Sequence, residues 1–400
     1  MKKQRSLTPN YAALQAMIWA EYGFLFSYAN PYLTEKLGLT DTAAGLIMGV
    51  ATGMAFLLQP LLTMLADRTR FRVRQVLLLS SAVSSLSAAA ALIPWSRTAV
   101  TAILFALSCV ALQVLPAFAN ALGMQEMHAG KRVDFGLARG IGSVCFGLGA
   151  KAATPLIAWL GMDAVALMGA VTAAGVLAAT ALFPAVSGTS ARPEEAERPD
   201  GALEFFRKNR RFAVLLVGIV LLYIGHNVLS NCMFRIAQLK LGSTDQTAAT
   251  AVQGTTLMIA AVAELPTMFL FTKAVRRVRC DILLLISCAF MTLRLALTLL
   301  LPGAWGLYLV QLTQLPGFAL FAVSTVYYVG SVVEKRNVVK GQTYLAAANT
   351  FGCLLAYVLG GALIDAMGVR NMLLVCTAIS AAGLALALRS TKRVATAVGV

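Results

Sequence analysis

The chain has 400 residues, of which 59% are hydrophobic and only 12% are charged. A soluble domain carries about twice that fraction of charged residues, so this composition excludes an ordinary globular protein. The net charge is +16. A nucleic-acid-binding protein would also be basic, but its basic residues would cluster on one face.

Long apolar runs separated by short polar loops recur along the whole sequence. A helix that crosses a membrane needs about twenty apolar residues. The first run has no small-residue cleavage site after it, so we interpret it as a span and not as a signal peptide. The pattern predicts an all-α membrane protein without a soluble domain, and its twelve predicted spans are residues 10–34, 42–65, 75–95, 99–123, 135–159, 163–185, 212–233, 247–272, 281–302, 304–331, 342–365 and 370–389.

The basic residues follow the predicted loops. If the N-terminus is cytosolic, 25 of the 33 Lys and Arg residues lie on the cytosolic side, four lie outside and four lie within spans. This asymmetry is the positive-inside rule. We therefore expect a multi-pass protein of the inner (cytoplasmic) membrane with both termini in the cytosol. Its partner is then the lipid bilayer and not a nucleic acid.

The residues that usually build metal or catalytic sites are sparse. Seven cysteines are scattered through the spans or at their edges without a CxxC pair, and there are only two histidines. Cysteines in such positions behave as small apolar residues. The sequence also has no nucleophile elbow and no phosphate-binding loop. We expect no cofactor, no metal site and no enzymatic activity.

The longest polar segment divides the predicted spans into six and six. Residues 187–211 are rich in Pro, Glu and Arg, which is typical of a cytosolic linker. The spans before and after it echo each other, because the second span ends FLLQPLLTMLADR and the eighth reads VAELPTMFLFTKAVRR. Two six-span halves, here 1–186 and 212–400, are the architecture of major facilitator transporters.

The loop after the second span resembles the major facilitator signature G-x-L-A-D-R-x-G-R-R. In TMLADRTRFRVR, Asp67 and Arg68 match the signature, and Arg70 and Arg72 supply its basic cluster, whereas Thr63 stands where the glycine is usual. A carboxylate at a helix end and nearby arginines can form a latch that must break when the transporter opens inward. The alternative is a basic loop that only sets the topology.

Two arginines lie inside apolar stretches, where a charge is least tolerated. Arg139 stands in FGLARGIGSVCFGLGA and Arg294 in LLLISCAFMTLRLALTLLL. A guanidinium cannot lose its proton to escape the cost of burial in a bilayer. Such residues normally face a water-filled cavity. We therefore expect both to bind something there.

The chain resembles the oligosaccharide:proton symporter branch of the major facilitators, the group of lactose permease. The resemblance is patchy over nearly all of the chain and is strongest in NPYLTEKLGLTDTAAGLIMG, LLQPLLTMLADR, DFGLARGIGS and the span around Arg294. It implies that Arg139 holds sugar hydroxyls. It also implies that Arg294 belongs to a proton-coupling network.

Several positions that are charged in that branch are neutral here. They fall on Ala119 or Asn120, on Asn227 and Ser230, on Gln311, on Gln314 and Gly317, and on Gly352. Acidic and basic positions of the branch are both neutral in this chain. Their joint loss is physically consistent, because a lone buried charge costs more free energy than a buried ion pair. Amide-rich sites suit uncharged ligands with many hydroxyls. The predicted substrate-binding residues are Arg139, Glu21, Asn120, Asn227, Gln311 and Gln314.

Proton coupling requires a group at membrane depth that changes its charge. Glu21 and Glu264 are the acids well inside predicted spans. We prefer Glu264, which can pair with Arg294, as the carrier. Glu21 can be a counter-ion to Arg139, a substrate ligand or a buried acid that stabilises the fold. His226 titrates near neutral pH and is a further coupling candidate, although a lone histidine in a helix is more often a packing residue.

The leading hypothesis is a monomeric secondary transporter that works by alternating access. Its substrate would be a small sugar, glycoside or related metabolite that moves with a proton. One alternative is transport of an aromatic or other organic acid anion held by Arg139 and Arg294. Efflux of hydrophobic drugs and a non-transporting sensor or scaffold are further alternatives.

Overall fold

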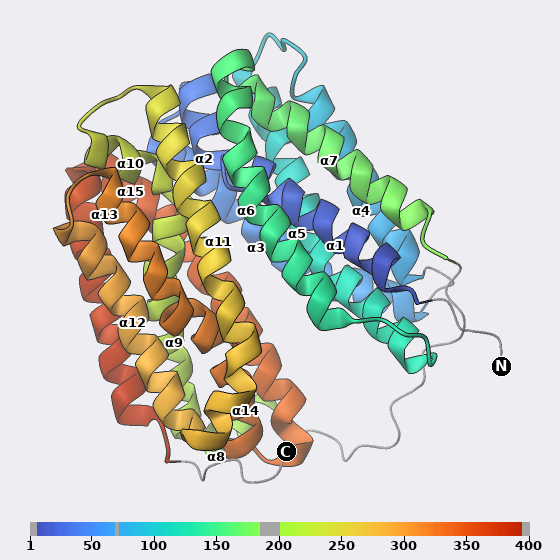
Figure 1. The fold of residues 1–400 in the computed structure, drawn as a ribbon, viewed down its shortest axis with the longest axis vertical. Coiled ribbons are helices and arrows are strands. Elements are labelled where there is room, and N and C mark those ends of the chain that lie inside the picture. The colour runs from blue at the N-terminus through green and yellow to red at the C-terminus, as the bar shows by residue number, and fades with distance from the viewer. Residues whose placement is uncertain (1–5, 69–71, 185–200, 394–400) are drawn as a thin grey trace. The chain divides into compact units, whose positions relative to one another are not determined.

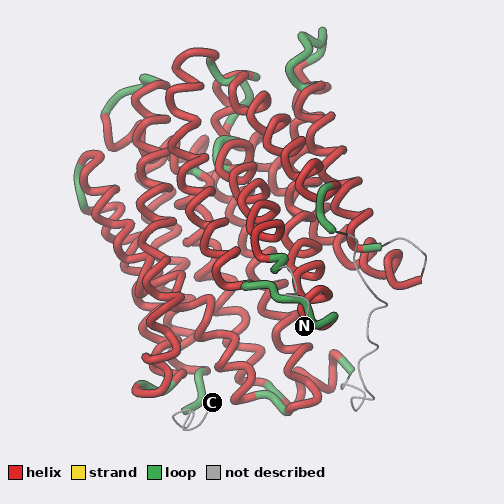
Figure 2. The backbone as a smooth tube through the Cα atoms, turned by 45° about the vertical axis from the view of Figure 1, so that its right-hand side comes forward, coloured by secondary structure: helices red, strands yellow, loops and turns green. Residues whose placement is uncertain are grey.

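The regular structure is helical. The computed structural model describes residues 6–68, 72–184 and 201–393, and no strand occurs in these ranges. Ten of the described helices are long and apolar enough to cross a membrane. Figures 1 and 2 show helices throughout the described residues. The predicted class, an all-α membrane protein, is confirmed.

Eight of the twelve predicted spans are each a single helix. These are α3 (Asp41–Arg68), α4 (Val73–Ala90), α5 (Thr98–His128), α6 (Phe135–Leu160), α7 (Asp163–Ala181), α9 (Arg210–Asn231), α11 (Gln246–Arg277) and α12 (Cys280–Leu300). The last two predicted spans form one continuous element, α15 (Val338–Ser390), which turns at Gly368. Gly368 has φ +80°. A residue without a Cβ adopts this value without strain, so the chain reverses there without a loop.

The remaining two spans are broken. The first consists of α1 (Thr8–Glu21), η1 (Tyr22–Phe26), α2 (Ala29–Pro31) and η2 (Tyr32–Lys36), where both η segments are π-helical. The tenth consists of α13 (Gly303–Val310), the 3₁₀ turn η3 (Gln311–Gln314), the π-helical η4 (Leu315–Ala319) and α14 (Leu320–Val332). Irregular turns inside membrane helices often mark functional sites. The short helices α8 (Ala202–Lys208) and α10 (Met233–Leu241) and the turn η5 (Lys335–Asn337) complete the described elements.

The chain divides into two compact units. The first contains residues 1–192 together with 245–261, and the second contains residues 193–244 and 262–400. Helix α11 therefore begins in the first unit and ends in the second. Within the first unit α1 packs on α6 and α7, and α4 packs on α5 and α7. Within the second unit α9 packs along α15, and α12 packs on α14 and α15.

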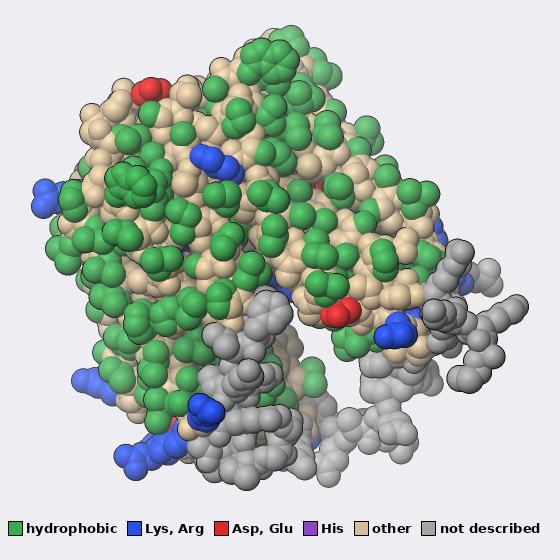
Figure 3. Space-filling model, in the orientation of Figure 1, with side chains coloured by type: hydrophobic (Ala, Val, Ile, Leu, Met, Phe, Trp, Pro, Cys, Tyr) green, Lys and Arg blue, Asp and Glu red, His purple; other side chains and the backbone are tan. Residues whose placement is uncertain are grey.

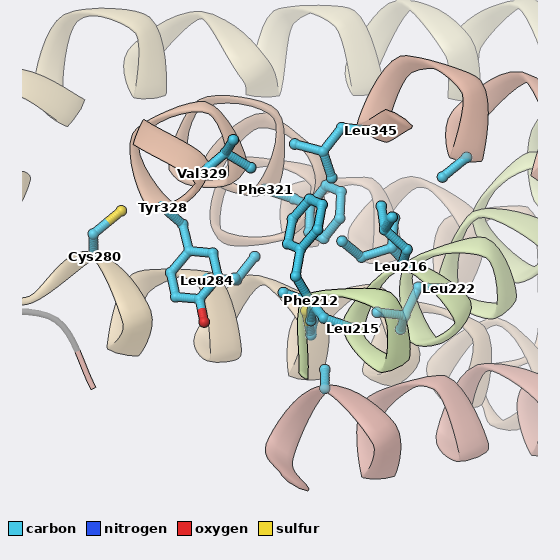
Figure 4. Close-up of a cluster of buried hydrophobic side chains, with 14 of the residues drawn as sticks. Phe212, Leu215, Leu216, Leu222, Cys280, Leu284, Phe321, Tyr328, Val329 and Leu345 are labelled. Atoms are coloured by element: carbon cyan, nitrogen blue, oxygen red, sulfur yellow. The ribbon is translucent and has the colours of Figure 1, made fainter. Parts of the chain in front are cut away.

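Aliphatic and aromatic side chains fill the core of the second unit. Phe212, Leu216, Leu284, Phe321 and Tyr328 are all buried in one cluster (Figure 4). Large apolar side chains are also exposed on the outside, and on the face drawn in Figure 3 hydrophobic atoms cover much of the helical surface. Lipid solvates such a surface, so the pattern is that of a membrane protein.

Candidate functional site

Arg139 stacks on an aromatic ring in the first unit. It is half-buried on α6, and its guanidinium carbon lies 4.0 Å from the centroid of Trp19 on α1. Its Nη1 donates a hydrogen bond of 3.1 Å to the hydroxyl of Ser143, one turn along α6. Gly142 makes room for the indole, because a Cβ at that position would lie 2.5 Å from Cδ1 of Trp19. A cation held over an indole is a favourable arrangement that also fixes the plane of the guanidinium.

A buried glutamine connects this pair with Asn120. The indole Nε1 of Trp19 donates to Oε1 of Gln15 at 3.0 Å. The Nε2 of Gln15 donates to the hydroxyl of Tyr11 at 2.8 Å and to Oδ1 of Asn120 at 3.2 Å. The structure therefore brings two predicted ligands, Arg139 and Asn120, into one network.

Four members of this network were missed in the sequence, namely Ser143 on α6 and three residues of α1. Tyr11, Gln15 and Trp19 follow one another on α1 at intervals of four residues, and residues at that spacing share one face of a helix. Polar and aromatic side chains at this spacing in a membrane helix were the available signal. Because most of the span is apolar, these side chains do not stand out in its hydropathy.

Glu21 lies on another side of α1. It is fully buried, and its Oε1 accepts a hydrogen bond of 2.5 Å from the hydroxyl of Ser84 on α4. The Ser84 hydroxyl is also 3.0 Å from that of Ser108 on α5. Two residues along a helix correspond to a rotation of about 200°, so Glu21 points away from the face that carries Trp19. This placement fits a buried acid that joins three helices better than a counter-ion to Arg139.

Arg294 gathers polar side chains in the second unit. It lies on α12 and is 2% exposed. Its Nη2 donates to Oε1 of Gln311 at 2.6 Å, and its Nη1 donates to Oε1 of Gln314 at 3.0 Å. The same Nη1 is 3.3 Å from Nδ1 of His226. Among the described residues its Nε has no hydrogen-bond partner.

Gln314 also connects Arg294 with Glu264. Its Nε2 donates to Oε1 of Glu264 on α11 at 3.1 Å, while its Oε1 accepts from Arg294. The two ends of one amide therefore bind an acid and a base. The predicted association of Glu264 with Arg294 runs through this amide.

His226 and Asn227 are neighbours on α9 with different surroundings. The ring of His226 stacks on Phe318 with centroids 4.3 Å apart and also meets Arg294. It thus combines a packing role with a polar one. The side chain of Asn227 donates to the carbonyl of Tyr223 at 2.8 Å, on its own helix. None of the hydrogen bonds described for Asn227 joins it to the Arg294 cluster.

The predicted latch lies at the edge of what the structure describes. Asp67 and Arg68 end α3, but their side chains, and all of Arg70, lie outside the described residues. Arg72 precedes α4, and its backbone N–H donates to Oε1 of Gln75 at 2.6 Å. The latch therefore stays a prediction.

Comparison with known families places these clusters in context. The family model of the MFS_1 like family matches residues 10–375. The chain belongs to this family. Members are built on the major facilitator fold, in agreement with the helical architecture above. No match to a curated protein sequence was found.

Several solved structures that resemble this chain over nearly its whole length are transporters. A mutant of the nucleoside transporter NupG has a TM-score of 0.80 and 16% identity, covering 97% of this chain and all of its own. An auto-inhibited POT family peptide transporter has a TM-score of 0.73 and 12% identity, covering 98% of each chain. A bacterial homologue of the lysosomal transporter Spinster, inward-facing and occupied, has a TM-score of 0.65 and 13% identity, covering 97% of this chain and 98% of its own. At these identities the likeness establishes the fold alone.

Proposed function

We propose that this MFS_1 like protein is a secondary transporter that moves a small, uncharged, hydroxyl-rich solute together with a proton. Sugars and glycosides are the substrate class, as in the oligosaccharide:proton symporter branch. A nucleoside, the substrate named for NupG, is a glycoside too and belongs to the same chemical class. The observation that carries the proposal is the pair of arginine-centred polar clusters, one in each unit.

The side chains of both clusters suit hydroxyl groups. Guanidinium groups donate several hydrogen bonds in a fixed plane, and amides both donate and accept. Arg139 and Asn120 belong to the first cluster, and Arg294, Gln311 and Gln314 belong to the second. We infer that a solute binds by replacing some of these internal bonds.

The proton is assigned to Glu264. Because Gln314 binds both Glu264 and Arg294, a change of charge on the carboxyl alters the bond between the amide and the guanidinium. A carboxyl at membrane depth in such a network is a common site for proton transfer in transporters. His226 contacts the same guanidinium group, and we assign it a role in proton coupling as well.

We propose an inner-membrane location with both termini in the cytosol, a monomeric state and a cytosolic latch. The distribution of basic residues supports the topology, since 25 of the 33 Lys and Arg fall on one side of the spans. Asp67, Arg68, Arg70 and Arg72 supply the charges of the latch.

Transport in proteoliposomes tests the proposal. Lactose, uridine and benzoate serve as probes for a sugar, a nucleoside and an aromatic acid. We expect lactose or uridine uptake to be driven by a pH gradient and to make the external medium alkaline. Glu264→Gln should keep exchange of solute across the membrane but lose accumulation driven by the gradient. Glu204→Gln, on the exposed surface of α8, is the control. Uptake without any pH change would exclude proton coupling.

The same assay tests an anion as the alternative substrate. The spans contain the cations Arg139, Lys151, Arg235 and Arg294 but only two acids well inside them, Glu21 and Glu264. Lys151 binds the hydroxyl of Thr255 at 2.6 Å. This excess of positive charge favours an anionic solute. Uptake of benzoate that is abolished by Arg139→Gln, with lactose and uridine inert, would decide for the anion.

A further inference from the structure

The tenth span changes its helical geometry at the residues that bind Arg294. Gln311 and Gln314 are the first and last residues of a 3₁₀ turn. Side chains three residues apart eclipse each other in a 3₁₀ helix, whereas in an α-helix they are offset by about 60°. The 3₁₀ turn therefore lets two amide oxygens accept from one guanidinium, at 2.6 Å and 3.0 Å.

A 3₁₀ turn is not the usual geometry inside a long helix. Runs of 3₁₀ helix have poorer hydrogen bonds and are usually short. The next segment, η4, begins with Leu315 and Pro316 and contains Gly317, whose φ −88° and ψ −107° are not helical. Pro316 has no N–H to donate to the preceding turn. A contact from a neighbouring helix can satisfy the freed backbone groups and hold the segment in one arrangement.

Thr267 on α11 supplies such a contact. Its hydroxyl donates to the carbonyl of Leu315 at 3.0 Å, and the residue is 5% exposed. Hydroxyls of neighbouring helices commonly stabilise broken membrane helices in this way. Thr267 lies three residues after Glu264, so both side chains point from the same side of α11. They bind adjacent residues, Leu315 and Gln314.

We propose that Thr267 is a positioning residue for the Arg294 cluster. Its hydroxyl fixes the start of η4 against α11, so that Gln314 binds Arg294 and Glu264 at the same time. This inference rests on the proposed function for the role of the cluster in transport, but the positioning itself is independent of the solute. Thr267 acts through the irregular segment and does not touch the guanidinium in any described contact.

Thr267→Val and Thr267→Ser test the inference, because valine keeps the shape and serine keeps the hydroxyl. The control is Thr325→Val in α14, a residue of similar burial (6% exposed) whose hydroxyl bonds to carbonyls of its own helix. Hydrogen–deuterium exchange of peptides covering residues 311–320 measures the order of the segment. Loss of one interhelical hydrogen bond in a membrane protein should speed this exchange about threefold.

We expect faster exchange in Thr267→Val and wild-type exchange in both Thr267→Ser and Thr325→Val. The apparent KM for lactose or uridine should rise in Thr267→Val with Vmax per folded protein retained, and serine should restore it. A purely structural role would lower the amount of folded protein and leave KM unchanged.

Equal exchange in Thr267→Val and the wild type would overturn the inference. An equal rise in Thr325→Val, or faster exchange with an unchanged KM, would overturn it as well. Failure of the proposed function looks different. If the proposed function is wrong, the wild type transports neither solute. The hydrogen–deuterium exchange data alone then test whether Thr267 positions the segment.

Discussion

Nη1 of Arg294 and Oε1 of Gln314 lie 3.0 Å apart, and this bond orients the amide so that its Nε2 faces Glu264. A single neutral side chain thus organises the polar centre of the second unit. The glutamine offers a fixed donor and a fixed acceptor and does not titrate.

Gln314→Leu should destabilise the protein. The substitution leaves a buried guanidinium without one of its acceptors, at a cost of about 1–3 kcal/mol. The midpoint of thermal unfolding in detergent measures this loss. Thr313→Val is the control, because the hydroxyl of Thr313 bonds within its own turn, to Val310. Equal midpoints for the two variants would show that the amide contributes nothing to the fold.

Arg139→Lys should weaken solute binding although the charge is kept. Lysine cannot reproduce the planar stack on Trp19 or the directed bond to Ser143, which together correspond to about a tenfold loss of affinity. Counterflow of lactose or uridine measures the effect. Arg235→Lys, an arginine near Phe234 outside the cluster, is the matched control. Wild-type affinity in Arg139→Lys would contradict a role for the guanidinium plane.

Two glycines of α6 should respond differently to alanine. At Gly142 a Cβ would lie 2.5 Å from the ring of Trp19, so the indole must move and lose its place against Arg139. At Gly140 no atom lies within 4 Å of the added Cβ. We expect Gly142→Ala to reduce solute uptake, and Gly140→Ala to raise stability by about 0.5–1 kcal/mol through helix propensity. Similar uptake in both variants would argue against a fixed position for Trp19.

Gly254→Ala should disturb the contact between the start of α11 and α6. A Cβ at this position would lie 2.7 Å from the carbonyl oxygen of Ala150 and 2.9 Å from the hydroxyl of Tyr28. Backbone cannot move aside as a flexible side chain can, so the helices must separate at a cost of about 1–3 kcal/mol. The midpoint of thermal unfolding measures this cost. The control is Gly330→Ala in α14, where no atom lies within 4 Å of the added Cβ. An unchanged unfolding midpoint would mean that α11 and α6 can move apart here at little cost in stability.

Glu21→Gln should fold and should transport with an unchanged pH dependence. Glutamine keeps an oxygen that accepts from Ser84, whereas Glu21→Ala removes the acceptor and should cost about 1–3 kcal/mol of stability. Unfolding midpoints compare the two variants, and pH-driven uptake is measured for Glu21→Gln. If Glu21→Gln loses accumulation driven by the pH gradient, then Glu21 and not Glu264 carries the proton.

The sequence by itself determined the class of protein and the apolar stretches from which its long helices form. Apolar run length is a local property, and the bilayer imposes the same minimum length on every span. The two arginines in apolar stretches also pointed to polar centres, because a charge that cannot be neutralised needs partners wherever it is buried. Both clusters are present around Arg139 and Arg294.

Only the tertiary structure decided which side chains meet. Gln15 and Asn120 are 105 positions apart in the chain, and Thr267 and Leu315 are 48 apart, so no local pattern brings them together. Glu21 shares an apolar span with Trp19, yet the rotation of the helix sends it to Ser84. The tertiary structure also decided where the first and tenth spans break. Hydropathy reports how apolar a segment is, whereas the geometry of its turns depends on hydrogen bonds from neighbouring helices.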